Sequence, residues 1–195
     1  MSSTFLAFAS RMKYINRWAL MRNTSDENLS THSFEVAVAS HMLALIGNRR
    51  FGTNYNSDRA AVMGLYHDMP EILTGDMPTP VKYYNSEIIK AYEQVEKAAT
   101  ERLINALPAD LREDFEPFFV IKPEDEALRK IVKAADKICA YIKCLEERKA
   151  GNTEFRKAEE TILNSVKKID LPEVKVFMEE FIPAFELTLD QISDK

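Results

Sequence analysis

Histidine and aspartate are the residues of this chain whose types and spacing suit a metal ion. The sequence contains only three histidines, His32, His41 and His67, and Asp68 follows His67 directly. Imidazole nitrogen and carboxylate oxygen together bind borderline divalent cations. A His-Asp pair by itself is equally compatible with a surface ion pair or a helix C-cap, so a metal site requires further ligands.

A second carboxylate, Asp136, is placed to face inward on a helix. It lies in the segment KIVKAADKICAYIK, and its neighbours one helical turn away, Val132 and Cys139, are apolar. A buried carboxylate needs a partner, which is either a metal ion or one of the chain's lysines and arginines. Spacing alone leaves both interpretations open.

The remaining histidines differ in their suitability as ligands. His32 and His41 lie nine residues apart on one predicted helix. This spacing is about 900° of rotation, or two and a half turns, so the two side chains point to opposite sides and cannot face the same site. His32 lies near a helix end beside a loop and is the better ligand, whereas His41 is predicted to be structural or exposed. His32, His67, Asp68 and Asp136 would hold one divalent ion, and the sequence does not choose among Mn²⁺, Co²⁺, Fe²⁺, Mg²⁺ and Zn²⁺.

Other residues suited to phosphate chemistry lie close to these ligands in the sequence. Glu71 comes four positions after His67, within reach of a metal-bound water, and Asp76 lies in the Gly-Pro loop beyond it. Arg17 offers a guanidinium that can bind phosphate oxygens at two points. Trp18, the only tryptophan, offers a flat face for a base or sugar, although a lone tryptophan is more often part of a core.

Helices are predicted to position these residues, because the apolar periodicity is helical almost throughout. A central helix, apolar on most sides, is predicted from an N-cap at Ser30 or Thr31 to about Ile46, with Gly47 at its end. Segment 74–84 is predicted to be a loop. The other predicted helices are 4–13, 58–68 with Ser57 as N-cap, 70–73, 86–106, 109–119, 124–150, 153–168 and 172–192 with a kink at Pro183.

The composition, with 46% hydrophobic and 29% charged residues, indicates a chain that can bury a core. Together with the helical periodicity and the lack of a linker-like stretch, it predicts one all-α domain spanning residues 1–195. The net charge of −5 disfavours binding to a nucleic acid polymer. We expect no membrane span, since no run of about 18 apolar residues exists. Cys139 and Cys144 lie about 140° apart on one predicted helix, which fits reduced thiols and a cytoplasmic location.

The spacing H…HD…D resembles that of the HD-domain phosphohydrolases, a helical metal-dependent superfamily. The bare HD pattern accompanies many functions, whereas HD-x-x-E-x-L-T-G-D-x-P-T-P together with N-R-W is much more specific. The segments that are similar to the bacterial 5′-deoxynucleotidases of this superfamily are INRWALMRN (15–23), S-x-H (30–32), YHDMPEILTGDMPTPVKY (66–83), KAADKICAYIKCLEE (133–147) and FIPAFELTLDQIS near the C-terminus.

The resemblance implies a compact all-helical HD domain that is homodimeric and cytoplasmic. It implies removal of phosphate from deoxyribonucleoside 5′-monophosphates with one divalent ion, Co²⁺, Mn²⁺ or similar. The implied metal ligands are His32, His67, Asp68 and Asp136. The implied catalytic residues are Arg17, which orients the phosphate, Glu71 and Asp76. The implied substrate contacts are Arg17, Trp18, His32 and the loop Asp76-Met77-Pro78-Thr79. Which carboxyl group protonates the leaving oxygen stays open.

Two other interpretations remain. Another HD hydrolase would act on a triphosphate or a signalling nucleotide, which needs several clustered cations. Near the motifs we find mainly Arg17, with Arg22 and Lys82 as additions, and this favours a monophosphate. A non-catalytic helical binding protein is disfavoured, because nothing structural requires the four proposed ligands. For a dimer surface the last helices offer only Phe177, Phe181 and Phe185, and such residues more often belong to the core.

Overall fold

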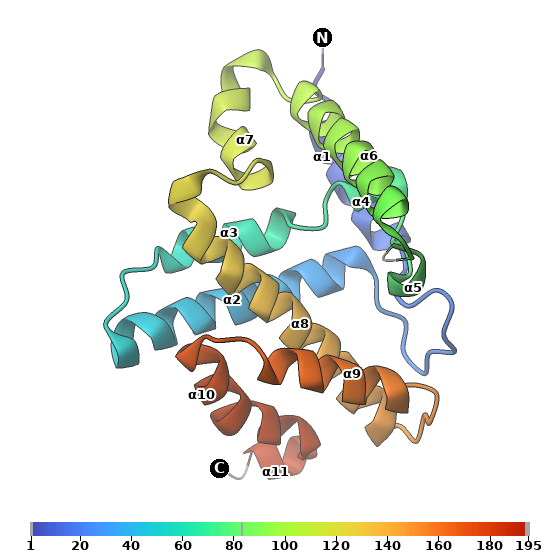
Figure 1. The fold of residues 1–195 in the computed structure, drawn as a ribbon, viewed down its shortest axis with the longest axis vertical. Coiled ribbons are helices and arrows are strands. Elements are labelled where there is room, and N and C mark those ends of the chain that lie inside the picture. Colours follow the sequence, from blue (N-terminus) through green and yellow to red (C-terminus); the bar gives the residue numbers. More distant parts are fainter. Residues whose placement is uncertain (1, 83, 194–195) are drawn as a thin grey trace.

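The computed structural model describes residues 2–82 and 84–193, and this part of the chain is helical apart from its loops (Figure 1). The extended structure within it is an isolated antiparallel bridge between Asn16 and Asn28. The all-α fold expected from the periodicity is therefore confirmed.

The α-helices are α1 (Phe5–Ala9), α2 (Leu29–Phe51), α3 (Ser57–Tyr66), α4 (Glu71–Thr74), α5 (Thr79–Lys82), α6 (Ser86–Asn105), α7 (Arg112–Phe119), α8 (Glu126–Lys149), α9 (Arg156–Lys167), α10 (Pro172–Glu180) and α11 (Leu189–Ser193). The 3₁₀ helices are η1 (Ser10–Tyr14), η2 (Ala109–Leu111), η3 (Pro123–Asp125) and η4 (Ile182–Glu186).

Helices α2 and α8 cross at the centre of the molecule (Figure 1). Helix α2 also packs against α3 and α10, and the completely buried side chains of Val36, Leu43, Ile131 and Ile138 lie in the core between these helices. A second apolar cluster, which includes Leu29, joins the N-terminal helices to α6. The predicted central role of the helix after residue 30 is thus confirmed.

The ends of α2 differ from the prediction. Its N-cap is Asn28, whose side chain accepts a hydrogen bond from the Thr31 backbone N–H. The helix continues through Gly47 and ends at Gly52, which has φ +69°. Gly47 serves packing instead, because a Cβ there would lie 2.8 Å from both Thr53 Oγ1 and the Tyr55 ring. The predicted helix end at Gly47 is therefore wrong, because this glycine allows close packing inside the helix.

Three further predictions of local structure were wrong in detail. Helix α3 is capped by Asn56 and not by Ser57. The segment 74–84 contains α5, whose first turn accommodates Pro80 because a first-turn N–H has no helical partner. Tyr83 lies outside the described residues. The C-terminal helix is broken into α10, η4 and α11, since Pro183 removes a backbone donor.

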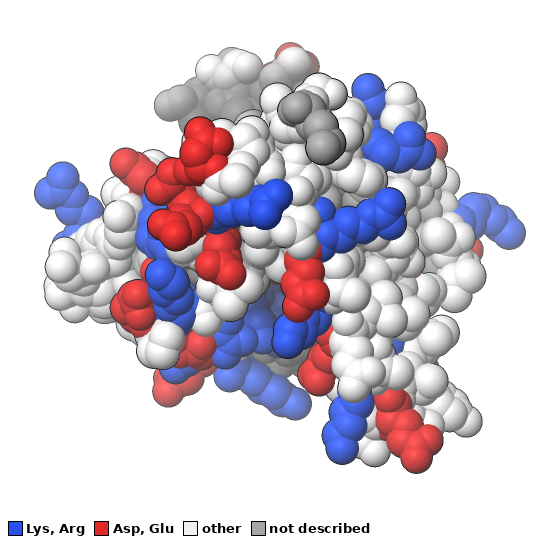
Figure 2. Space-filling view, turned by 90° about the horizontal axis from the view of Figure 1, so that it is seen from above, with Lys and Arg blue, Asp and Glu red and all other residues white. Residues whose placement is uncertain are grey.

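The surface carries both signs of charge. At the end of the molecule near α6 and α7, acidic and basic side chains are interspersed (Figure 2). This differs from the clustered cations that bind a nucleic acid backbone. Among the described residues, none of the helices combines the length and apolarity that crossing a bilayer requires.

Candidate active site

The four residues predicted to bind metal meet in the folded chain. We call them the ligand quartet: His32 in the first turn of α2, His67 and Asp68 directly after α3, and Asp136 in the middle of α8. His32 Nε2 lies 3.1 Å from Asp136 Oδ1 and 3.6 Å from Asp68 Oδ2, and His67 Nε2 lies 3.1 Å from Asp68 Oδ2. One ligand atom each from His32, His67 and Asp68 lie within 4.8 Å of one another, and Asp136 joins them through His32.

The backbone of α3 orients His67. Its Nδ1–H donates a hydrogen bond of 2.7 Å to the Gly64 carbonyl, which turns Nε2 toward Asp68 and His32. Gly64 lets α3 approach α2, because a Cβ at this position would lie 2.8 Å from the Ala37 Cα. Within the described residues His67 Nε2 has no hydrogen-bond partner, although Asp68 Oδ2 is near it. A nitrogen and a carboxylate oxygen held this way can share a proton or bind one cation.

The charges of the quartet suit a divalent cation. Burial opposes ionisation of Asp68 and Asp136, but His67 and Arg17 lower the pKa of Asp68, and the contact with His32 lowers the pKa of Asp136. Burial also disfavours the imidazolium of His67, yet attraction to Asp68 outweighs it and raises the pKa of His67 to about 9. The site therefore attracts positive charge strongly, and two imidazoles with two carboxylates fit a borderline divalent ion.

Asp136 points toward His32, as predicted, but it is not sealed from solvent. Its side chain is 39% exposed because it borders a cavity of about 460 Å³. The cavity has the size of a small-molecule site, and His67, Asp68 and Asp136 line part of it. Its other walls include cationic and aromatic residues, among them Tyr66, Lys82, Phe118, Arg129 and Lys133.

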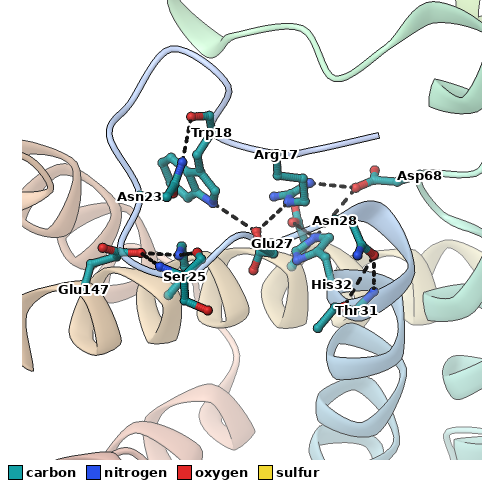
Figure 3. Close-up of polar contacts among 12 residues, drawn as sticks. Arg17, Trp18, Asn23, Ser25, Glu27, Asn28, Thr31, His32, Asp68 and Glu147 are labelled. Carbon is teal, nitrogen blue, oxygen red and sulfur yellow. Dashed lines mark hydrogen bonds and ion pairs between the residues drawn. The ribbon is translucent and has the colours of Figure 1, made fainter. Parts of the chain in front are cut away.

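Arg17 lies directly beside the quartet. Its Nη1 donates to Asp68 Oδ2 at 3.0 Å, and its Nε donates to Glu27 Oε2 at 2.9 Å (Figure 3). The side chain is 13% exposed. Burial works against its charge, but Asp68, Asp136 and Glu27 raise the pKa of Arg17, so the guanidinium is firmly cationic. A phosphate that reached the quartet would meet this cation.

Trp18 occupies the same loop with an unusual backbone. It is a non-glycine residue with φ +58°, a conformation that costs energy and is concentrated at functional sites. Its Nε1 donates to Glu27 Oε2 at 3.0 Å (Figure 3). Its ring packs on Phe155 with centroids 5.3 Å apart. Trp18 is half-buried, so part of its side chain packs against the protein and part is accessible from outside.

The remaining predicted site residues follow α3. Glu71 is 8% exposed, and burial together with Asp68 and Asp76 raises the pKa of Glu71 to about 8. Burial also raises the pKa of Asp76. Met77 and Pro78 are half-buried between α4 and α5, and the side chain of Thr79 lies outside what the structure describes. His41 stays away from the quartet, 41% exposed and 3.6 Å from Asp58, as predicted.

Comparison with known proteins shows the family of this chain. Residues 4–185 match the family described as 5′-deoxynucleotidase YfbR-like. The chain belongs to this family. The YfbR-like chain is 50% identical to a 5′-deoxynucleotidase of Vibrio vulnificus over 191 residues, which cover 98% of each protein.

Solved structures share the fold of this YfbR-like protein. An HD-domain phosphohydrolase from Listeria innocua matches with a TM-score of 0.80 and 21% identity, over 97% of this chain and 92% of the other. A cyanophage S-2L HD phosphohydrolase, bound to dA and one catalytic Zn²⁺, matches with a TM-score of 0.65 and 19% identity, over 96% and 100% of the two chains. The fold is therefore that of the HD-domain phosphohydrolases, as the sequence motifs indicated.

Two residues near the site were not identified from the sequence of this YfbR-like protein. Glu27 accepts hydrogen bonds from both Arg17 and Trp18, and no short motif marks it. Lys133 lines the cavity together with Asp136. Its position three residues before Asp136 on the same helix places it on the same face, and this spacing is a signal that was available.

Proposed function

We propose that residues 1–195 form a single domain that hydrolyses deoxyribonucleoside 5′-monophosphates to deoxyribonucleosides and phosphate. The observation that carries the proposal is the ligand quartet with the Arg17 guanidinium 3.0 Å from Asp68. Membership of the YfbR-like family, with a 5′-deoxynucleotidase 50% identical over nearly the whole chain, supports this substrate class.

His32, His67, Asp68 and Asp136 hold one divalent ion in this proposal, Co²⁺, Mn²⁺ or similar. Such an ion, when bound, makes its water more acidic and polarises a phosphoryl oxygen. The single catalytic Zn²⁺ in the cyanophage structure supports one ion per site. Metal analysis of the purified protein tests the ligand set, because Asp136→Ala should bind less than one equivalent. Full binding and full activity in this variant would contradict it.

Arg17 and two carboxyl groups bind the phosphate and transfer the proton that the reaction requires. Arg17 binds the phosphate oxygens and balances the negative charge of the transition state. A proton must reach the 5′ oxygen as the P–O bond breaks, and Glu71 or Asp76 delivers it. We assign the acid to Glu71, whose Oε2 is buried and lacks a hydrogen-bond partner among the described residues. Asp76 then orients water and substrate.

Trp18 and the loop after α4 contact the nucleoside. The indole gives the sugar an apolar neighbour, which cannot hydrogen-bond a 2′-hydroxyl and so favours deoxyribose. His32, Asp76, Met77, Pro78 and Thr79 complete the substrate contacts in this proposal.

A panel of nucleotides tests the activity. The protein loaded with Co²⁺ or Mn²⁺ is expected to release phosphate from deoxyribonucleoside monophosphates faster than from ribonucleotides, triphosphates or cyclic nucleotides. Preference for a triphosphate or a cyclic nucleotide would show a different HD hydrolase. Absence of both bound metal and activity would show a non-catalytic binding protein.

We propose that the protein is a homodimer, as the sequence resemblance implies. Exposed apolar residues on α2 support this, because Phe34 and Val38 lie one turn apart and are 63% and 53% exposed. Phe177 of the last helices is 6% exposed and stacks on Phe181, so it belongs to the core.

We further propose a cytoplasmic location. Cys139 and Cys144 are free thiols, both buried, which suits a reducing compartment. Fractionation of the source cells tests this, since activity in an extracellular or periplasmic fraction would contradict it.

A further inference from the structure

The segment before α2 places Glu27 opposite Arg17. The Arg17 backbone N–H donates to the Glu27 carbonyl at 2.9 Å, and the Leu29 N–H donates to the Ile15 carbonyl at 3.0 Å. Asn16 and Asn28 form the antiparallel bridge between these two pairs. Residues that face each other across an antiparallel pair direct their side chains to the same side. The backbone therefore holds the Glu27 carboxylate beside the Arg17 guanidinium.

One oxygen of Glu27 accepts hydrogen bonds from both residues that are proposed to bind substrate, Arg17 and Trp18. Oε2 accepts the Arg17 Nε–H at 2.9 Å and the Trp18 Nε1–H at 3.0 Å (Figure 3). Glu27 is 6% exposed, so water does not compete for this oxygen. Hydrogen bonds to a carboxylate are shorter and stronger than those between neutral groups.

These bonds fix the orientation of the guanidinium. Arg17 is held at Nε by Glu27 and at Nη1 by Asp68, on two different sides. These two bonds restrain the rotation of the guanidinium. Its N–H groups that are not used in them therefore keep a fixed orientation relative to the quartet. A guanidinium that must meet a phosphate in one geometry gains from such restraint before the substrate arrives.

The same oxygen fixes the indole. Trp18 has φ +58°, a backbone conformation that persists only when surrounding contacts hold it. Glu27 holds the N–H edge of the ring, and Phe155 packs on the ring. The Trp18 carbonyl also accepts hydrogen bonds from the Met21 N–H at 2.9 Å and Asn23 Nδ2 at 3.3 Å, which support the backbone. Loss of the Glu27 contact removes the hydrogen bond on the ring itself and lets the indole rotate away from the sugar.

We propose that Glu27 is a positioning residue that couples phosphate binding to sugar discrimination, because one carboxylate oxygen aligns both Arg17 and Trp18. The inference rests on the proposed function, which assigns phosphate to Arg17 and deoxyribose to Trp18. Glu27 itself touches neither the quartet nor the reacting atoms in this scheme. Its effect is transmitted through two side chains.

The test is Glu27→Gln in the full metal-loaded enzyme, assayed on deoxyadenosine and adenosine 5′-monophosphate. The amide keeps the shape of the side chain, and its one carbonyl oxygen can still accept the two hydrogen bonds, but without the charge that strengthens them. We expect kcat on the deoxyribonucleotide to fall roughly 10- to 100-fold, with a smaller change in KM. The ribonucleotide-to-deoxyribonucleotide ratio of kcat/KM should rise several-fold. Asp26→Asn, an exposed neighbour that loses the same charge, should change neither.

A double-mutant cycle separates positioning from mere stability. If Glu27 acts on kcat through Arg17, Arg17→Ala/Glu27→Gln has the same kcat as Arg17→Ala alone. Independent, multiplying losses in kcat, or an unchanged substrate ratio in Glu27→Gln, overturn the inference. Thermal unfolding checks that each variant is folded. If Glu27→Gln does not fold, Glu27→Asp replaces it. This variant keeps the charge but moves the carboxylate back by one methylene, and the same measurements of kcat and of the substrate ratio decide.

The controls distinguish this inference from the proposed function. An inactive wild-type enzyme, or an Arg17→Ala variant with full kcat, overturns the proposed function and this inference with it. A wild type that is active and an Arg17→Ala variant that is impaired, beside an unimpaired Glu27→Gln, overturn the positioning role of Glu27 alone.

Discussion

The carboxyl groups around this site differ in charge because burial acts on both Asp68 and Glu71, but only Asp68 has close cationic neighbours that outweigh it. Glu71 lies three residues after Asp68, yet burial raises its pKa to about 8, whereas His67 and Arg17 keep the pKa of Asp68 low despite burial. At neutral pH one group is therefore a carboxylate, suited to a cation, and the other retains a proton. Pairs of acids whose environments separate their pKa values are typical of hydrolytic sites.

The first prediction concerns the acid. Glu71→Gln should lower kcat by roughly 10²- to 10⁴-fold with little change in KM, because an amide has no acidic proton to deliver. Asp76→Asn should cost less. Steady-state phosphate release measures both, with the exposed Glu87→Gln as a control. A larger loss of kcat in Asp76→Asn would assign the acid to Asp76 instead.

The second prediction concerns the sugar. Trp18→Ala should raise activity on ribonucleotides relative to deoxyribonucleotides by on the order of 10-fold, because the apolar wall beside C2′ is removed. Paired measurements of kcat/KM on the two substrates give the ratio. Tyr14→Ala, an exposed aromatic of the same segment, should leave it unchanged. An unaltered ratio in Trp18→Ala would exclude this role.

Contacts between elements, more than local propensity, hold the loop between η1 and α2 in place. Glu147 on α8 is 1% exposed and accepts hydrogen bonds from Thr24 Oγ1 at 2.6 Å and from Asn152 Nδ2 at 2.8 Å, besides Lys143 Nζ. Lys143 Nζ also donates to the Ser25 carbonyl at 2.5 Å. The loop that carries Arg17 and Trp18 is thus anchored to the C-terminal end of α8.

The third prediction follows from this anchor. Burial opposes the charge of Glu147, but bonds from Lys143, Thr24 and Asn152 outweigh it and lower its pKa to about 2. A lowered folded-state pKa stabilises the fold above the unfolded value, and this contribution is lost as the pH falls toward 2. Glu147→Gln should cost about 3 kcal/mol at pH 7, and the difference should shrink below about pH 4.5.

Urea unfolding at several pH values measures this difference. The neighbouring exposed Glu146→Gln is the matched control and should be close to wild type at pH 7. A Glu147→Gln penalty that is constant from pH 7 to pH 3 would show that the carboxylate charge does not anchor the loop.

The fourth prediction concerns the contact between α2 and α3. Gly64→Ala puts a methyl group 2.8 Å from the Ala37 Cα, so the two helices must separate and carry His67 away from His32. We expect a loss of about 1–3 kcal/mol in unfolding free energy and a roughly 10- to 100-fold loss of metal affinity. Urea unfolding and calorimetric metal titration test this. Leu65→Ala, an exposed position on α3, should affect both little, and unchanged metal affinity in Gly64→Ala would contradict the argument.

The molecule as a whole combines a buried α2–α8 crossing with an outer face of α2 that remains apolar. Phe34 and Val38 are exposed while the opposite side of α2 lies in the core. Contact with a second copy would remove this apolar surface from water, which is favourable. Such an arrangement is what the homodimer proposal requires.

The fifth prediction tests that surface. Phe34→Ser/Val38→Ser should shift the protein from dimer to monomer, as measured by sedimentation at several concentrations. Leu6→Ser, which alters a residue that is 78% exposed on α1, should remain dimeric. A wild-type protein that is monomeric throughout, or a double variant that remains dimeric, would contradict the dimer proposal or its location.

Local sequence patterns are enough to predict the fold class and most of the proposed site residues of this protein. Helical periodicity predicted an all-α chain because side-chain period follows directly from backbone geometry. The HD motif and Asp136 singled out residues that the fold brings together, since histidine and inward-facing aspartate are scarce and chemically distinctive.

Other properties depend on residues distant in the chain, so only the tertiary structure decided them. The close packing of Gly47 and Gly64 depends on which element approaches each glycine. The raised pKa of Glu71 depends on burial, and the role of Glu27 depends on the pairing of residues 15–17 with 27–29. Burial, close approach and shared hydrogen bonds are properties of pairs in space, which a linear pattern does not record.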